Sequence, residues 1–329
     1  MWRLIRVLFQ IITVLSVAVI SFWLFGPREK VDLTADFDPR KFGEGVQVYF
    51  ESVESEFDDI TPGVEKRVIW QDGFKEQRTP VSILYVHGFS ATSEEIRPVP
   101  DRLAGALGAN LVYTRLTGHG RGGDAMAEAT VHDWMQDTAE GLAAARAVGE
   151  KVVVLSTSTG GTLATAVALD AKMSQDVAAL IFVSPNFGVN DSSAPLLTMP
   201  GAEWFLPILA GKRHSFEPSS PEQGTYWTTE YPVVSLLPMA ALVKTVVAMP
   251  FEQVQIPALF WFSPQDQVVR GDITEDIAAR WGADAQVQLV EPGDGIAASM
   301  HVIAGDIISP GGTDPAVAGM LHWLRTQGL

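Results

Sequence analysis

The stretch KVVVLSTSTGGTLATAVAL, residues 151–169, decides the fold of this 329-residue chain. Residues 152–155 form an apolar, β-branched run without alternation, which is typical of a strand buried on both faces, and the last eight residues predict a helix. Ser158 therefore lies where a parallel strand bends into a helix. The strained backbone of such a bend needs small neighbours, and Ser156, in place of the usual glycine, and Gly160 flank it by two residues. The context predicts a nucleophilic serine, although the pentapeptide alone fits an ordinary loop equally well.

A second strand is predicted at Val81–Val86, and it ends in the tetrapeptide His87–Ser90. An acyl-transfer site holds its oxyanion with two backbone N–H groups, one after the nucleophile and one from the loop after a neighbouring strand. Thr159 and Phe89 occupy these positions, so we expect their N–H groups to form the oxyanion hole. His87 is expected to brace this loop rather than to act as a base, because it lies at the strand end.

An acid and a base are expected on loops after later strands, in chain order behind the serine. Asp266 follows the apolar run Pro257–Phe262, and His301 follows a short strand that ends at Val290. His301 is the only one of the six histidines that comes after both Ser158 and Asp266 on a loop behind a strand. We therefore predict these three residues as nucleophile, acid and base. Three other aspartates are weaker candidates for the acid: Asp272, Asp276 and Asp294.

From about residue 45 to the C-terminus, the chain resembles α/β-hydrolase-fold serine hydrolases, most closely the monoacylglycerol lipase and carboxylesterase branch. Besides the serine bend and the His-Gly loop, LTGHGR at 116–121 and VHDW at 131–134 are similar to segments of that branch. The resemblance implies a mostly parallel, doubly wound sheet with an inserted cap, and it implies that the predicted nucleophile, acid and base form a catalytic triad. His119, in the first of these segments, is expected to pack within its loop rather than to catalyse.

The chain outside the motifs predicts one α/β domain. Apolar runs alternate with helical stretches in its later part, which is the pattern of right-handed parallel crossovers. The first strands, joined by short links, are expected to be antiparallel. Strands are predicted near residues 46–50, 65–70, 81–86, 110–114, 152–155, 179–183, 257–262 and 286–290.

The stretch at about 187–253 interrupts that alternation with prolines among apolar clusters. We expect it to be an inserted cap, or lid, over the nucleophile, and an apolar lid favours a lipophilic substrate. The alternative is that its apolar side chains only pack the insertion onto the main domain.

The N-terminus carries an apolar segment. Val7–Phe25 contains no charge and as a helix is about 29 Å long, close to the roughly 30 Å thickness of a bilayer core. We expect residues 1–26 to be an uncleaved transmembrane anchor and residues 27–329 to be the hydrolase domain. A cleaved signal peptide and a buried core helix are the alternatives. Basic residues lie on both sides of the span, so charge does not settle its orientation, but a short flank before a long domain favours a catalytic domain outside the cytoplasm.

Composition restricts the possible partners. The 23 basic and 39 acidic residues give a net charge of −16, which disfavours nucleic acids and anionic lipid surfaces. The chain has no cysteine, which excludes disulfides, a thiol nucleophile and thiolate metal sites. No metal, dinucleotide or phosphate-loop motif appears, so we expect neither a cofactor nor a metal. The expected partners are a small lipophilic ester and, through the N-terminal helix, a membrane.

These observations predict a serine hydrolase, a carboxylesterase or monoacylglycerol-lipase-like enzyme, that cleaves carboxylic esters of apolar acyl groups through an acyl-enzyme intermediate. The alternatives on the same fold are acyl transfer, peptide or carbon–carbon bond hydrolysis, and a non-catalytic binding protein. The intact order of the three residues argues against the last. Fold and triad set the chemistry whereas the lid sets the substrate, so the acyl length stays open.

Overall fold

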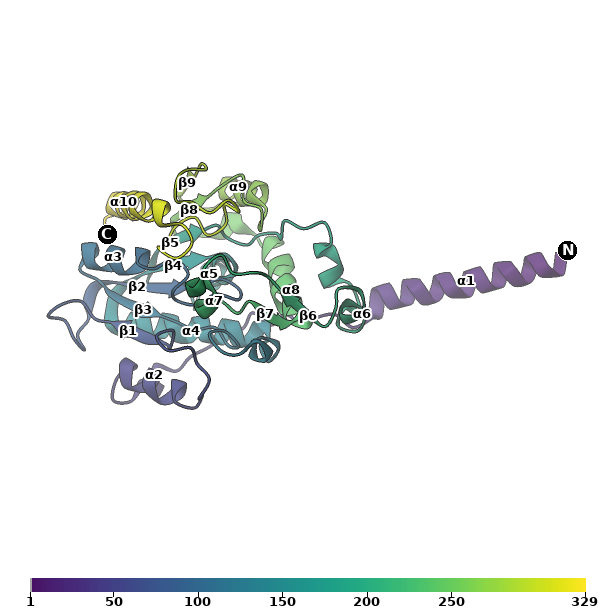
Figure 1. Ribbon diagram of the computed structural model, residues 1–329, viewed down its shortest axis with the longest axis horizontal. Coiled ribbons are helices and arrows are strands. Elements are labelled where there is room, and N and C mark those ends of the chain that lie inside the picture. Colours follow the sequence, from purple (N-terminus) through teal and green to yellow (C-terminus); the bar gives the residue numbers. More distant parts are fainter. Residues whose placement is uncertain (1) are drawn as a thin grey trace.

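The computed structural model describes residues 2–329, and its body is a seven-stranded sheet between helices (Figure 1). The strand order is β1-β3-β2-β4-β5-β8-β9. β1 is antiparallel to β3 and all other neighbours are parallel, so the predicted antiparallel start is confined to β1. The strands are β1 (Arg67–Ile69), β2 (Thr79–Val86), β3 (Asn110–Tyr113), β4 (Gly149–Thr157), β5 (Val177–Val183), β8 (Ala258–Phe262) and β9 (Ala285–Leu289).

Successive side chains of the strands point into two separate cores. Leu84 and Val154 belong to the core that holds α4, α5 and α9, whereas Ile83 and Leu155 belong to the core that holds α3 and α10. The sheet is therefore covered on both faces, as its uninterrupted apolar runs predict. The helices are α1 (Trp2–Phe25), α2 (Val46–Glu54), α3 (Val99–Leu107), α4 (Val131–Val148), α5 (Thr159–Leu169), α6 (Ala202–Leu209), α7 (Pro221–Tyr226), α8 (Leu236–Val247), α9 (Gly271–Ala279) and α10 (Pro310–Thr326).

The strand predicted near residues 46–50 is wrong, because this segment is helix α2. The alternation in VQVYF favours a strand locally, but helical spacing buries Val46, Phe50 and Glu54 on one face. The Gln47 side chain accepts a hydrogen bond from the Val68 N–H at 3.0 Å, which ties the helix to β1. Tertiary contacts have thus overridden the local pattern.

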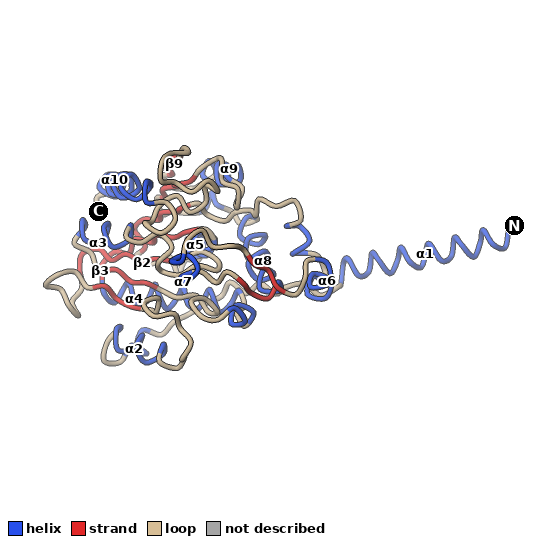
Figure 2. The backbone as a smooth tube through the Cα atoms, in the orientation of Figure 1, coloured by secondary structure: helices blue, strands red, loops and turns tan. Residues whose placement is uncertain are grey.

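The connection between β5 and β8 holds α6, α7, α8 and a two-stranded antiparallel sheet of β6 (Arg213–Ser215) and β7 (Glu230–Pro232). A small apolar core joins its parts, with Ala202 and Leu206 of α6 against Val233 and Leu237. The tube in Figure 2 shows this region between the main sheet and α1. We call it the β5–β8 connection.

Helix α1 extends away from the body (Figure 1), and none of its residues is buried. The alternative of a buried core helix is therefore wrong. Within residues 2–329 it is the one helix long and apolar enough to cross a membrane, a property that a signal sequence near the N-terminus shares.

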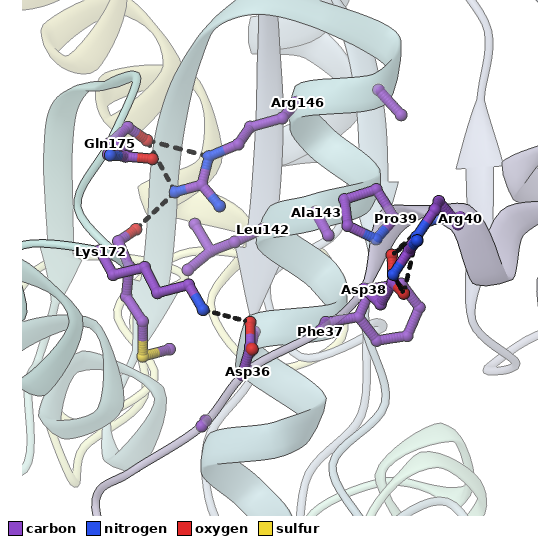
Figure 3. Close-up of a pocket in the computed structure, with 14 residues that line it drawn as sticks. Asp36, Phe37, Asp38, Pro39, Arg40, Leu142, Ala143, Arg146, Lys172 and Gln175 are labelled. Carbon is purple, nitrogen blue, oxygen red and sulfur yellow. Dashed lines mark hydrogen bonds and ion pairs between the residues drawn. The ribbon is translucent and has the colours of Figure 1, made fainter.

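The chain after α1 runs back along the body as an extended arm, which the sequence did not predict. Its apolar side chains at every second position pack against the main core: Val31, Leu33, Ala35 and Phe37. Figure 3 shows the arm bordering a cavity beside α4, where Lys172 forms an ion pair with Asp36 at 2.7 Å and Arg146 donates to the carbonyl of Gln175. The apolar side chains of the arm therefore hold it against the body.

Candidate active site

Ser158 occupies a strained bend between β4 and α5. Its backbone angles, φ 50° and ψ −118°, lie where residues with a side chain are rarely found. Gly160 has to be a glycine, since an added Cβ would lie 2.2 Å from the carbonyl oxygen of Val86. The Ser158 N–H donates to the Val183 carbonyl at 3.0 Å, which ties the bend to β5. The predicted strand-to-helix bend is present.

Ser156 takes the position where glycine is usual in such bends. Its side chain is fully buried, and its hydroxyl donates a hydrogen bond to the Ile181 carbonyl of β5 at 3.2 Å. The hydroxyl therefore has a partner inside the sheet, which removes the cost of burying it. This departure leaves the bend intact.

Side chains from three loops form one hydrogen-bonded chain. His301 Nε2 lies 3.1 Å from Ser158 Oγ, and His301 Nδ1 lies 2.7 Å from Asp266 Oδ2. Both distances are within the reach that a nucleophile, its base and an orienting acid require. The Asp266 side chain is 1% exposed and that of His301 12%, so the chain lies largely out of water, where electrostatic interactions are stronger. The structure thus brings the three predicted residues together.

Asp266 is held by its own loop. Its Oδ1 accepts hydrogen bonds from the N–H groups of Val268 and Val269 at 2.7 and 2.9 Å, which leaves Oδ2 for His301. Asn190, in the β5–β8 connection, donates to the Asp266 carbonyl at 3.0 Å, and no sequence pattern marked it. The weaker candidates for the acid have other surroundings. Asp272 and Asp276 form ion pairs with arginines, and Asp294 is exposed.

The two predicted oxyanion donors border the same cavity as Ser158. The chain at Gly88 passes so close to the serine that an added Cβ would lie 3.0 Å from Ser158 Cβ. Within residues 2–329 the N–H of Phe89 has no hydrogen-bond partner. Thr159 is the first residue of α5, where a helix leaves its N–H groups without intrahelical partners. Both donors are therefore available.

His87 braces this loop, as predicted. Its Nε2 accepts a hydrogen bond from the Leu116 N–H at 3.1 Å, so its Nδ1 carries the proton and donates to the Gly88 carbonyl at 2.8 Å. That carbonyl belongs to the same peptide as the Phe89 N–H, so His87 orients the donor. Burial lowers the pKa of His87 well below its usual range, which keeps the ring neutral.

Glu95 is a buried part of the site that has no sequence signal. Its Oε2 accepts hydrogen bonds from the Gly88 N–H at 2.8 Å and from the Tyr85 hydroxyl at 3.0 Å. Burial raises the pKa of Glu95 to about 7, against the opposing effects of the Gly88 hydrogen bond and of His301. Glu95 and His87 thus hold successive peptides next to Phe89.

The LTGHGR segment is anchored by a buried ion cluster. Asp137 Oδ2 accepts hydrogen bonds from the N–H of Thr117 at 2.6 Å and from its hydroxyl at 2.8 Å, and Asp137 Oδ1 lies 2.9 Å from Lys66 Nζ. Lys66 also pairs with Glu140 at 2.5 Å. Burial opposes the charge on Lys66, but the two carboxylates raise its pKa above the usual range. The cluster fixes the loop beside the site.

His119 packs inside that loop. Burial lowers the pKa of His119 to about 4. Its ring lies edge-on to Phe89 at 5.6 Å and to Trp134 at 5.9 Å between centroids. A neutral ring between aromatic side chains is a packing residue, as the sequence predicts.

A cavity of about 640 Å³ includes Ser158 and His301 in its wall, a size usual for small-molecule sites. Among residues 2–329, no group of three His, Cys, Asp or Glu side chains is placed to hold a metal ion. Much of the remaining wall is apolar and comes from the β5–β8 connection, including Leu206, Leu209, Val233, Leu236 and Met239.

Comparison with known proteins identifies a family for this chain. The Alpha/beta hydrolase family matches residues 83–305. The thermostable monoacylglycerol lipase of Bacillus sp. (strain H-257) is 29% identical over 196 residues, which cover 60% of this chain and 74% of that protein.

Solved structures share the fold. A structure described with LipS and LipT, two metagenome-derived lipolytic enzymes, has a TM-score of 0.61 at 20% identity and covers 81% of this chain and 99% of its own. A soluble variant of monoglyceride lipase from Saccharomyces cerevisiae has a TM-score of 0.58 at 13% identity, with coverages of 80% and 91%. The monoacylglycerol lipase of Paleococcus ferrophilus has a TM-score of 0.53 at 13% identity, with coverages of 80% and 99%.

The sheet, the bend at Ser158 and the family match together define the class: the chain belongs to the alpha/beta hydrolase family. Within that family it resembles monoacylglycerol lipases and lipolytic esterases, to which it is distantly related.

Proposed function

We propose that this chain is a serine hydrolase that cleaves carboxylic esters of apolar acyl groups, with Ser158, His301 and Asp266 as its triad. The observation that carries the proposal is the hydrogen-bonded chain from Ser158 Oγ through His301 to Asp266. The strained bend at the serine and the available N–H groups of Phe89 and Thr159 support it.

The mechanism follows from these positions. His301 Nε2 takes the proton of Ser158 as its oxygen attacks the ester carbonyl, and Asp266 stabilises the imidazolium through Nδ1–H. The N–H groups of Phe89 and Thr159 stabilise the oxyanion of the tetrahedral intermediate. His301 then gives the proton to the leaving alcohol, and an acyl-enzyme remains. Water, deprotonated by His301, attacks the acyl carbonyl and releases the carboxylic acid and free Ser158.

The substrate class rests on the cavity and on the relatives. An apolar wall contributed largely by the β5–β8 connection suits an acyl chain, and the relative from Bacillus is named a monoacylglycerol lipase. We propose that residues 187–253 are a cap that selects the acyl group. We also propose that residues 1–26 are an uncleaved membrane anchor, with the catalytic domain, residues 27–329, outside the cytoplasm.

Labelling with a fluorophosphonate probe tests the nucleophile directly. The parent should be labelled and Ser158→Ala should not, while its turnover of a nitrophenyl ester falls by on the order of 10⁵ or more. Ser156→Ala, which removes a neighbouring hydroxyl that has its own partner, is the matched control and should still be labelled. Equal labelling of Ser158→Ala and the parent overturns the assignment.

Chain-length panels separate the remaining functions. Glyceryl and nitrophenyl esters of increasing acyl length should show a preference for longer chains that short-chain esterases lack. A labelled enzyme that releases no acid but passes the acyl group to an added alcohol is instead an acyltransferase. An unlabelled, inactive protein is a binding protein on this fold.

A further inference from the structure

The end of α1 is docked on α6 rather than joined to the body by a free tether. The Gly201 N–H, one residue before α6, donates a hydrogen bond to the Pro27 carbonyl at 2.7 Å. The ring of Phe22 lies 6.4 Å from that of Trp204 between centroids. Figure 1 shows α6 at the base of α1. Since the arm after Pro27 packs along the body, the chain is held on both sides of this junction.

Helix α6, AEWFLPIL, is apolar except for the exposed Glu203 in its first turn, and only one side of it is covered. Ala202 and Leu206 face the small core of the β5–β8 connection. Trp204, Ile208 and Leu209 are 61, 82 and 68% exposed. An apolar helix is ordinarily covered all round, and a cluster of large exposed apolar side chains marks an interaction surface.

The position of α1 sets the depth of that surface in a membrane. The helix ends at Phe25, and Phe22 lies three residues, about 4.5 Å, inside that end. Trp204 contacts Phe22 and so lies at the same depth. Tryptophan is enriched at that level of a bilayer, and an interfacial helix buries its apolar face by about 5–10 Å.

We propose that the outer face of α6, formed by Trp204, Ile208 and Leu209, contacts the lipid bilayer as a continuation of the surface of α1, so that substrate enters the cavity from the membrane. Leu206, Leu209 and Ala210 also line the cavity that contains Ser158. One helix thus borders both lipid and active site, which gives a lipid acyl chain a direct path to the serine. The proposal rests on the anchor and the ester hydrolysis proposed above.

The absence of cysteine allows a direct test. Ile208→Cys in the full-length chain is labelled with a polarity-sensitive fluorophore and reconstituted into phosphatidylcholine vesicles, because a net charge of −16 disfavours anionic lipid. Lipids brominated near the glycerol end of the acyl chain should quench the label. Val48→Cys is the matched control: it is 49% exposed on α2, which lies far from α1 in Figure 1, and its label should not be quenched.

Equal, low quenching at the two positions overturns the proposal. So does disulfide cross-linking between two Ile208→Cys chains without lipid quenching, because a second copy then covers α6. Neither reading depends on catalysis. A parent protein that is inactive on every ester would contradict the proposed esterase function. The quenching result would still show whether α6 contacts lipid, so the two failures can be told apart.

An activity measurement gives the second test. Ile208 does not line the cavity, so Ile208→Asp should leave hydrolysis of water-soluble nitrophenyl acetate within about twofold of the parent. Hydrolysis of a long-chain monoacylglycerol embedded in the vesicles should fall about tenfold, since a charge is disfavoured at the lipid contact. Val48→Asp should change neither rate. Equal loss on the soluble and the embedded ester would contradict entry from the bilayer.

Discussion

The loops around Ser158 and the junction of α1 with α6 differ in how far the rest of the protein surrounds their side chains. Around Ser158 the protein itself supplies the partners: His301 is held by Asp266 at 2.7 Å, and the loop of Phe89 is held by two buried side chains. At the junction Ile208 is 82% exposed, so little of the protein lies against this side chain. The first region is therefore organised by the fold, whereas the second depends on surroundings outside the chain. Four changes test this contrast, in order of decreasing effect.

Replacing Asp266 with Asn removes the carboxylate that orients His301 in the organised region. Asn cannot stabilise the imidazolium and favours the wrong tautomer of His301, so turnover of a soluble ester should fall by on the order of 10⁴ with folding retained. Steady-state kinetics and circular dichroism check both parts. Asp294→Asn, at an exposed rival acid, should change little. A larger loss of turnover in Asp294→Asn than in Asp266→Asn would identify Asp294 as the acid instead.

Replacing Lys66 with Met tests whether the site depends on the buried ion cluster. The change leaves Asp137 and Glu140 close together without their cation, so the free energy of unfolding should drop by about 3–5 kcal/mol. Urea denaturation measures it. Lys172→Met removes the exposed pair with Asp36 that Figure 3 shows, and it should have no measurable effect. A similar drop in the free energy of unfolding in both variants would mean that the buried ion cluster stabilises the protein no more than an exposed ion pair does.

Replacing Glu95 with Gln probes the pH dependence of the organised region. Burial raises the pKa of Glu95 from 4.5 to about 7, so the folded state binds more protons than the unfolded state between these values. The free energy of unfolding should therefore decrease as pH rises through this window, by on the order of 2 kcal/mol between pH 5 and 8.

Glu95→Gln should flatten that slope, which urea midpoints at several pH values would show. The exposed Glu150→Gln is the control and should keep the parent's slope. Parallel profiles for the parent and Glu95→Gln would mean that Glu95 stays charged in the folded protein throughout the window.

Deleting residues 1–26 removes half of the junction and should have the smallest effect on chemistry. Every group of the hydrogen-bonded chain lies downstream of it, so activity on a soluble ester should stay within about threefold of the parent. Fractionation with an alkaline carbonate wash should keep the full-length protein with membranes and release the shortened one. Full-length protein in the wash, or a mature N-terminus beyond Phe25, would replace the anchor with a peripheral helix or a cleaved signal.

Local patterns predicted the parts of the fold that depend on neighbouring residues. Seven of the eight predicted strands are present. Five of them, β2, β3, β4, β5 and β8, carry apolar runs and are largely buried, as such runs predict, whereas β9 is mostly exposed. The exception is α2, where the alternation of VQVYF is outweighed by the burial of Val46 and Phe50. The order of Ser158, Asp266 and His301 along the chain was enough to predict them as nucleophile, acid and base. Each of them follows a strand, and the carboxyl ends of parallel strands lie on the same side of the sheet.

The sequence by itself determined the sheet, the bend at Ser158 and the apolar length of α1, because periodicity and small residues act over a few neighbouring positions. The tertiary structure alone decided the roles of Glu95, of the arm and of the α1–α6 junction. Glu95 reaches Gly88 only because the loop folds back on itself, and Phe22 meets Trp204 only because the arm returns along the body. The Phe22–Trp204 contact joins residues far apart in the chain, and the Glu95–Gly88 hydrogen bond depends on the path of the loop between them, so no local pattern encodes the energy of either.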